Sequence, residues 1–268
     1  MYYYSLANEM GVDAIHDFMK PLGFGQITGI DLPGEVRGVL PSTEWKRNTY
    51  KRAEQKKWFG GETISLGIGQ GYNAFTMLQL ATATTILANG GNKFTPHVVQ
   101  ATQDALTHQQ QAVATAPTTS LGFKPEHLEV IRNGLIGVAT SGTSAQVFAG
   151  SAYQSAGKTG TAQAVTIGQK DKYNAAKLSE HQRDHALYMA FAPADNPQIA
   201  LAVIVENAGF GAAHAAPIAR RVFDYWLLGQ YPSEEDIAAT QLGQTGRPIG
   251  APRAKKDVPL EAVSRTRR

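Results

Sequence analysis

The sequence predicts a mixed α/β (α+β) fold in which helices flank an antiparallel sheet. Two hydrophobic runs, residues 186–191 and 199–206, are joined by the turn sequence Pro-Ala-Asp-Asn-Pro at residues 193–197, a pattern typical of a β-hairpin. Strands joined by so short a connection pair antiparallel. Apolar residues recur at helical spacing in three longer segments, which are residues 75–89, 125–139 and 214–228.

The N-terminal third is predicted to be helical in three places. Residues 2–10 and 13–20 have the pattern of short helices, which Pro21 and the glycines that follow it bring to an end. Residues 75–89 form a longer helical pattern, and the glycine pair Gly90-Gly91 stands where a helix commonly stops.

The two later helices are each predicted to bury one face. In the first, residues 125–139, the apolar positions at helical spacing are Leu128, Ile131, Leu135 and Val138. In the second, residues 214–228, the side chains expected to point inward are Ile218, Val222, Tyr225 and Trp226.

After Gly229 the composition changes. Residues 231–268 are rich in Pro, Gly and charged residues, with seven Lys/Arg and five Asp/Glu. Such a segment buries little apolar surface, so the sequence predicts a disordered tail. Residues 1–230 are expected to form the folded part of the chain.

Composition fits a globular protein and excludes several classes of site. With 43% hydrophobic and 18% charged residues among 268, there is enough apolar material for a sizeable core. The absence of cysteine excludes disulfides and thiolate metal ligands. Seven scattered histidines show no metal-ligand spacing on a predicted helix, so neither a metal nor a cofactor is expected. No apolar run approaches the length of a membrane span, and the N-terminus lacks a signal-peptide pattern.

The net charge of +3 does not indicate a nucleic-acid partner. The tail supplies much of it, and acidic residues interrupt the other basic cluster. That cluster consists of Lys46, Arg47, Lys51, Arg52, Lys56 and Lys57. We interpret it as a solvated loop, and we interpret Trp45 and Trp58 beside it as packing anchors.

The segment with the clearest chemistry is residues 156–163, Ala-Gly-Lys-Thr-Gly-Thr-Ala-Gln, for which three interpretations compete. A phosphate-binding loop requires a helix after Lys158-Thr159, whereas Gly160 and the residues beyond it favour extended structure. A serine–lysine pair, Ser155 and Lys158, requires both side chains on one helical face, and on a strand they point to opposite faces. The third interpretation is a K-T-G strand that binds a substrate carboxylate.

Two other polar pairs leave alternatives open. Asp184-His185 contains a candidate general base, but a histidine at a strand start is also a common structural hydrogen-bonding residue. Glu206-Asn207 fits either the border of a cleft or a turn at the end of a strand.

The K-T-G segment is accompanied by other motifs in the order shown by class B penicillin-binding proteins. They are residues 31–35 (DLPGE), 67–71 (GIGQG), 78–81 (LQLA), 88–91 (ANGG) and 191–193 (FAP), with Thr76 before the third. A second set resembles the elongation-type members in particular, namely residues 3–4 (YY), 29–32 (GIDL), 44–46 (EWK), 183–185 (RDH) and 206–207 (EN). The resemblance runs from Tyr2 to about Leu228. It departs at Met77, where proline is usual, and at Ser144, where alanine is common; neither is expected to touch the chemistry.

This resemblance implies a fold of the penicillin-binding transpeptidase and serine β-lactamase type, incomplete in this chain. It implies that the parent protein is a serine-type D,D-transpeptidase, which cross-links D-Ala-D-Ala stem peptides of peptidoglycan during cell elongation and is acylated by β-lactams. It places the parent at the periplasmic face of the bacterial inner membrane, with its membrane anchor outside this chain, and implies a SEDS-type glycan polymerase as partner. The alternatives are a division-type transpeptidase, a β-lactam-sensing acyltransferase, or a non-catalytic binding module.

The resemblance also assigns roles to residues of the K-T-G strand. Lys158 would supply positive charge to the substrate carboxylate, and Thr159 and Thr161 would add hydroxyl hydrogen bonds. Thr161 would donate its backbone N–H to the oxyanion, and Gly160 would leave space for the substrate.

The nucleophilic serine is expected to lie outside this chain. In the family, the S-x-x-K and S-x-N or S-x-D motifs both precede the segment that begins here. Ser155 is the only serine in the sequence with lysine three residues later, and residues 5–8 (SLAN) are one residue too long for S-x-N. The resemblance therefore implies the C-terminal part of a transpeptidase domain.

Overall fold

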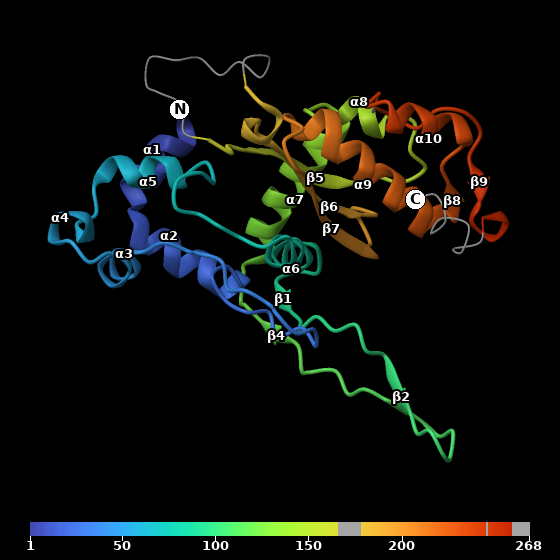
Figure 1. The fold of residues 1–268 in the computed structure, drawn as a ribbon, viewed down its shortest axis with the longest axis horizontal. Coiled ribbons are helices and arrows are strands. Elements are labelled where there is room, and N and C mark those ends of the chain that lie inside the picture. Colours follow the sequence, from blue (N-terminus) through green and yellow to red (C-terminus); the bar gives the residue numbers. More distant parts are fainter. Residues whose placement is uncertain (166–177, 245, 259–268) are drawn as a thin grey trace. The chain divides into compact units, whose positions relative to one another are not determined.

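The computed structural model describes residues 1–165, 178–244 and 246–258, which form two compact units, Met1–Phe123 and Lys124–Arg268 (Figure 1). Each unit is described by itself. Together they contain helices and antiparallel strand pairs, which confirms the predicted mixed α/β class.

The first unit is mostly helical. Its helices are α1 (Tyr2–Met10), α2 (Val12–Met19), α3 (Thr43–Thr49), α4 (Ala53–Lys56), α5 (Gly60–Leu66) and α6 (Met77–Ala88), with a 3₁₀ turn η1 (Lys20–Leu22). Its strands are β1 (Asn92–Lys93), β2 (Ala101–Gln103), β3 (Gln110–Ala112) and β4 (Thr119–Ser120). β1 pairs with β4 and β2 with β3, both antiparallel.

Helix α6 provides the centre of the first unit. Thr76 caps it by accepting a hydrogen bond from the Gln79 N–H at 3.1 Å, so the helix begins two residues later than predicted. Ile86 is fully buried in a core with Leu22 and Phe24. The Gln79 side chain, also fully buried, donates to the backbone carbonyls of Gln26 and Arg37, in the loop between η1 and α3, at 2.6 and 2.7 Å. These bonds satisfy a polar group that would be costly to bury alone.

The two carboxylates of the 31–35 motif, Asp31 and Glu35, accept hydrogen bonds from backbone N–H groups of loops. Asp31 accepts hydrogen bonds from the N–H groups of Val98 and Val99 at 2.7 and 2.9 Å, and these bonds lower the pKa of Asp31. Glu35 accepts from the N–H groups of Thr28 and Gly29. The motif therefore ties segments of the first unit together.

The basic cluster of residues 46–57 is solvated except for one member. Lys46 is 3% exposed, and its ammonium donates to both carboxylate oxygens of Glu62. It also lies over the rings of Trp58 and Tyr72, at 5.4 and 5.6 Å from their centroids. The prediction of a solvated loop is thus wrong for Lys46, because a carboxylate and aromatic faces take the place of water. Trp45 and Trp58 both contact Tyr72, as expected of packing anchors.

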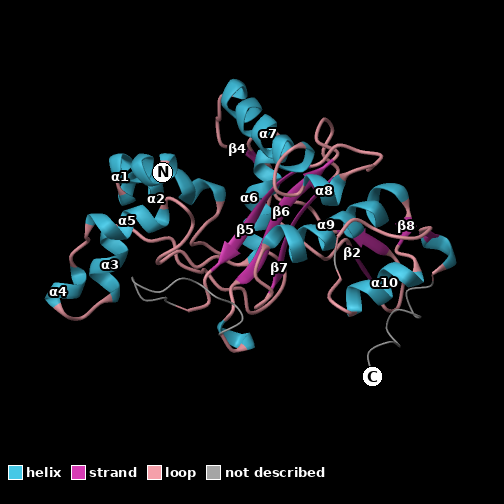
Figure 2. Ribbon diagram, turned by 90° about the horizontal axis from the view of Figure 1, so that it is seen from above, coloured by secondary structure: helices cyan, strands magenta, loops and turns pink. Residues whose placement is uncertain are grey.

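The second unit is built on a three-stranded antiparallel sheet in the order β5-β6-β7 (Figure 2). The strands are β5 (Ala156–Ala162), β6 (His185–Ala192) and β7 (Ile199–Val205), and β6 and β7 confirm the predicted hairpin. The helices are α7 (Pro125–Thr140), α8 (Ala145–Phe148), α9 (Gly211–Leu228) and α10 (Glu234–Gln241). Short elements complete the unit, namely the 3₁₀ turns η3 (Glu180–Gln182) and η4 (Lys255–Asp257) and the strands β8 (Gln230–Tyr231) and β9 (Arg253–Ala254).

Helix α9 packs on the sheet through small residues. Its fully buried side chains include Ala215, Ala216, Ala219 and Phe223. Val222 and Trp226, which the sequence predicts to be inward, are 39% and 59% exposed. The prediction selected the largest apolar residues, whereas alanines allow the helix to approach the sheet more closely. In α7, Leu128 is buried as predicted but Ile131 is 41% exposed.

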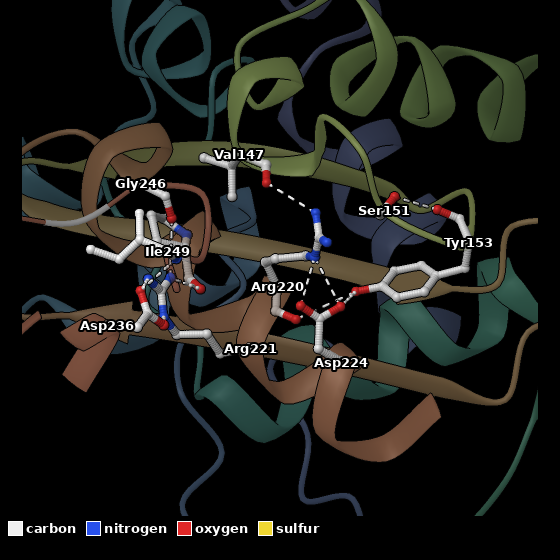
Figure 3. A network of polar contacts seen from close by, with 10 residues as sticks. Val147, Ser151, Tyr153, Arg220, Arg221, Asp224, Asp236, Gly246 and Ile249 are labelled. Atoms are coloured by element: carbon white, nitrogen blue, oxygen red, sulfur yellow. Dashed lines mark hydrogen bonds and ion pairs between the residues drawn. The ribbon is translucent and has the colours of Figure 1, made fainter. Parts of the chain in front are cut away.

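A buried ion pair joins α9 to the segment before β5. The Arg220 guanidinium donates to both oxygens of Asp224 at 2.9 Å and to the Val147 carbonyl at 3.2 Å (Figure 3). The Tyr153 hydroxyl donates to the same carboxylate at 2.8 Å. Burial, with the neighbouring Asp224 charge, raises the pKa of Tyr153, so this hydroxyl stays a donor at neutral pH.

Within residues 230–244 and 246–258 the structure contains short helices and strands, where the sequence predicts a disordered tail. Helix α10 is capped by Ser233, and Asp236 on its first turn accepts from the Arg221 guanidinium of α9 at 2.8 Å (Figure 3). Asp236 is 1% exposed. A buried ion pair, a capped helix and further contacts, such as the pairing of β8 with β9, hold a segment that contains few apolar residues. Composition alone does not reveal these contacts. Residues 259–268 lie outside the described residues.

Replacing Asp236 by alanine should destabilise the second unit by about 3 kcal/mol, the lower end of the range for a broken buried ion pair. The change leaves the Arg221 guanidinium without its carboxylate partner. Chemical denaturation followed by circular dichroism measures the difference. Glu235→Ala is the matched control, since Glu235 is exposed on the same helix and should change stability by about 0.5 kcal/mol or less. Equal stabilities for the two variants would contradict the anchoring role of Asp236.

Candidate functional site

The K-T-G segment lies on β5, at one edge of the described three-stranded sheet. Its register with β6 places Lys158 opposite Met189, Thr159 opposite Tyr188 and Gly160 opposite Leu187. The prediction of a strand is confirmed. An edge strand presents backbone N–H and C=O groups along its outer side, which can pair with an extended ligand.

Alternate side chains of β5 point to opposite faces of the sheet. Lys158 is exposed, and its ammonium donates to the Thr159 carbonyl at 2.6 Å. Thr159 and Thr161 share the other face and are each half-buried. Because the strand lies at the edge, side chains from both faces border its outer backbone.

The space available for a side chain differs between the two glycines of this segment, Gly157 and Gly160. A Cβ on Gly157 would lie 2.5 Å from the Tyr188 hydroxyl oxygen, so packing excludes any larger residue there. A Cβ on Gly160 would come only to 3.3 Å from the Leu187 Cβ, a tight but adjustable contact. A Cβ on Gly211, at the start of α9, would lie 2.6 Å from the Gly160 carbonyl oxygen. The start of α9 therefore approaches the β5 backbone closely.

A residue that the sequence reasoning did not select contacts the site. The Thr143 hydroxyl, in the loop between α7 and α8, lies 2.9 Å from the Thr159 hydroxyl. Next to it, the Ser144 hydroxyl donates to the Val138 carbonyl and lies 3.1 Å from the Tyr188 hydroxyl. Burial raises the pKa of Tyr188 to about 12, so this phenol remains neutral and able to donate.

The two competing interpretations of residues 155–159 do not fit the structure. In the described residues, β5 continues from Lys158-Thr159 to Ala162 instead of giving way to a helix, and this excludes the phosphate-binding loop. Ser155 is 2% exposed and directly precedes the strand, whereas Lys158 is exposed. The serine–lysine pair on one helical face is therefore also absent.

The other polar pairs have structural partners. His185 accepts a hydrogen bond at Nδ1 from the Asn207 N–H at 3.0 Å. The Asn207 side chain donates to the Arg183 carbonyl at 2.9 Å, and its backbone has a left-handed φ of 58°. These contacts favour a hydrogen-bonding His185 and a strand-end turn at Asn207.

Two further findings concern the residues that the structure describes. Among them, no group of three or more His, Asp or Glu side chains is arranged to hold a metal ion. No helix in the described ranges combines the length and apolar character that crossing a membrane requires.

Comparison with known proteins gives consistent results. The family model "Penicillin binding protein transpeptidase domain" matches residues 1–224. The peptidoglycan D,D-transpeptidase MrdA of Acinetobacter baumannii is 48% identical over 229 residues, which are 85% of this chain and 33% of the relative. The chain spans about a third of the length of the curated relatives it matches.

Solved structures agree with the sequence comparison. The crystal structure of Pseudomonas aeruginosa PBP2 in complex with WCK 5153 has a TM-score of 0.69 and 39% identity, covering 87% of this chain and 45% of that one. A complex between Helicobacter pylori PBP2 and MreC has a TM-score of 0.67 and 27% identity, covering 85% of this chain and 38% of that one. The match over residues 1–224 and the K-T-G edge strand lead to one assignment. This chain belongs to the penicillin-binding protein transpeptidase family.

Proposed function

We propose that this chain is the C-terminal part of an elongation-type peptidoglycan D,D-transpeptidase, with residues 1–230 belonging to the transpeptidase domain. The 48% identity to the Acinetobacter baumannii D,D-transpeptidase supports the activity, and the share of that relative's length supports a longer parent protein. Below, "the parent protein" means this longer transpeptidase, which carries both this chain and the nucleophilic serine.

The observation that carries the proposal is that β5, at the edge of the sheet, carries Lys158, Thr159, Gly160 and Thr161 in sequence. An extended stem peptide ending in D-Ala-D-Ala can add to this edge as a further strand. Its terminal carboxylate, or the carboxylate of a β-lactam, then meets the Lys158 ammonium. Charge-assisted hydrogen bonds of this kind are stronger than neutral ones.

The other residues of the strand have complementary roles in acyl transfer. The hydroxyls of Thr159 and Thr161 add hydrogen bonds to the carboxylate. The Thr161 N–H donates to the oxyanion that forms when the serine attacks the substrate carbonyl, and the serine's own N–H is the second donor. Gly160 keeps a Cβ out of the substrate path.

The nucleophile comes from a part of the parent protein outside this sequence. Ser155 is the only serine here in S-x-x-K register, and it is buried. A serine that forms an acyl-enzyme needs an adjacent base and access to the substrate. We therefore assign substrate binding and oxyanion stabilisation to this chain, and bond formation to the absent serine.

The same proposal implies a cellular location and partner proteins for the parent protein. Cross-linking of peptidoglycan places it at the periplasmic face of the bacterial inner membrane. The Helicobacter pylori neighbour is in complex with MreC, which supports an assembly of the parent protein with a partner of this kind. We propose a SEDS-type glycan polymerase as a further partner, because a cross-linking enzyme needs a supply of new glycan strands.

Substituting two glycines of β5 separates binding from folding. Gly160→Ala in the parent protein should keep the fold and lower the rate of acylation by a fluorescent penicillin roughly 10-fold, because the new methyl group lies in the substrate path. Gly157→Ala should instead cost about 1–3 kcal/mol of stability, since its Cβ would overlap the buried Tyr188 side chain. Denaturation curves and acylation rates measure both effects. Normal acylation of a folded Gly160→Ala variant would contradict the proposed substrate path.

A further inference from the structure

The loop between α7 and α8 presents one hydroxyl to the K-T-G strand. Thr143 Oγ1 lies 2.9 Å from Thr159 Oγ1, and either oxygen can be the donor in this hydrogen bond. Thr143 is exposed and Thr159 is half-buried, so both oxygens lie at the rim of the strand.

The backbone of this loop is held firmly on the side of α7. The N–H of Gly142 donates to the Gly137 carbonyl at 2.8 Å, and the N–H of Ser144 donates to the Val138 carbonyl at 3.1 Å. A Cβ on Gly142 would lie 2.8 Å from the Val138 Cα, so the turn requires glycine there. The position of Thr143 is therefore set by its two neighbours in the chain.

A second contact holds the loop on the side of the sheet. Ser144 is fully buried, and its hydroxyl lies 3.1 Å from that of Tyr188. Tyr188 stands directly opposite Thr159 in the register of β5 and β6. Two consecutive loop residues thus contact the two members of one cross-strand pair: Ser144 contacts Tyr188, and Thr143 contacts Thr159. The departure from alanine at Ser144 therefore has a structural consequence next to the candidate site.

The direction of the Thr143–Thr159 hydrogen bond determines what Thr159 can bind. A threonine hydroxyl has one proton and can accept two further hydrogen bonds, whereas an ionised carboxylate only accepts. If Thr143 donates to Thr159, the single Thr159 proton is free for a carboxylate. If Thr159 donates to Thr143, that proton is already used. A bound carboxylate selects the first direction. The hydrogen bond that Thr159 then accepts from Thr143 polarises the Thr159 O–H group and makes it a stronger donor.

We propose that Thr143 is a positioning residue that orients the Thr159 hydroxyl as a donor to the carboxylate of the ligand. The proposal rests on the proposed function of β5. It makes Thr143 a determinant of the preference for ligands with a free carboxylate, such as a stem peptide ending in D-alanine or a penicillin, over uncharged analogues. Thr143 acts through Thr159 and does not contact the reacting atoms.

The test compares two ligands and a matched pair of variants in the parent protein. Thr143→Val removes the hydroxyl with little change of shape, and Thr143→Ser retains it. Acylation rate constants are measured with benzylpenicillin and with its uncharged methyl ester. Thr143→Val should slow the reaction with benzylpenicillin about 2- to 12-fold, the loss expected for one ordinary hydrogen bond, and leave the reaction with the ester unchanged. Thr143→Ser should behave as wild type with both ligands.

A double-mutant cycle with Thr159→Val separates positioning from a general structural effect. If Thr143 acts through Thr159, adding Thr143→Val to Thr159→Val changes nothing further. The proposal is overturned by unchanged benzylpenicillin kinetics in Thr143→Val, by equal slowing with both ligands, or by additive effects in the cycle.

The same measurements distinguish a wrong role for Thr143 from a wrong function for β5. If Lys158→Ala and Thr159→Val slow benzylpenicillin acylation while Thr143→Val does not, only the role of Thr143 is wrong. If none of the three variants changes the rate, β5 does not bind the carboxylate, and both proposals are wrong.

Discussion

Replacing Lys158 by alanine in the parent protein should slow acylation by a penicillin about 10- to 150-fold, because a hydrogen bond to a charged group contributes about 1.5–3 kcal/mol. The fold should remain intact. Lys158 is exposed, and the contact that the structure shows for its ammonium is to the carbonyl of the next residue. Stopped-flow or gel-based acylation rates, together with thermal denaturation, measure the two properties separately.

Two further variants make this result specific. Lys158→Arg keeps the charge but replaces a compact ammonium by a planar guanidinium, so it should recover part of the lost rate. Lys56→Ala removes an exposed lysine in α4 and should leave acylation unchanged. A Lys158→Ala variant that reacts as fast as wild type would show that this lysine does not bind the carboxylate.

The strands of the β5-β6-β7 sheet could be predicted because local sequence determines them. The runs that became β6 and β7 are long and apolar and are joined by a proline-bounded turn, so few alternatives fit. The K-T-G segment was also identifiable as a strand, since its glycines disfavour a helix. In both cases the pattern and the local propensity agree.

The packing face of α9 could not be chosen from hydrophobicity alone. The helix contains two apolar groups of residues, one of alanines with Phe223 and one that includes Val222 and Trp226. The alanine side packs on the sheet because small side chains permit a close approach, and it includes the buried Arg220–Asp224 pair. A buried ion pair at i,i+4 spacing looks the same in sequence as a solvated one.

Long-range polar contacts explain the other differences. Lys46 is buried because Glu62, sixteen residues away, folds onto it. Asp236 of α10 pairs with Arg221 of α9, fifteen residues away in the sequence. The contact between Thr143 and Thr159 likewise depends on how a loop closes against a strand. None of these pairs has a spacing that local pattern reasoning can use.

The chain as given should form no covalent adduct with penicillin. Covalent catalysis needs a nucleophile that reaches the substrate and a base that takes its proton. Ser155 fails on both counts, since it is 2% exposed and Lys158 directs its ammonium to the Thr159 carbonyl. The remaining serines of the sequence have no lysine three residues later. The carboxylate site can therefore be present while bond formation is impossible.

Incubation of the purified chain with a fluorescent penicillin, followed by a denaturing gel, tests this directly. No labelled band should appear, while the parent protein treated in the same way should be labelled stoichiometrically. Ser155→Ala in the chain should look the same as the unmodified chain. A stoichiometric band that disappears in Ser155→Ala would mean that Ser155 becomes accessible and is activated in solution. In that case the residue directly before β5 would be the nucleophile, and the assignment of the nucleophile to another part of the parent protein would be wrong.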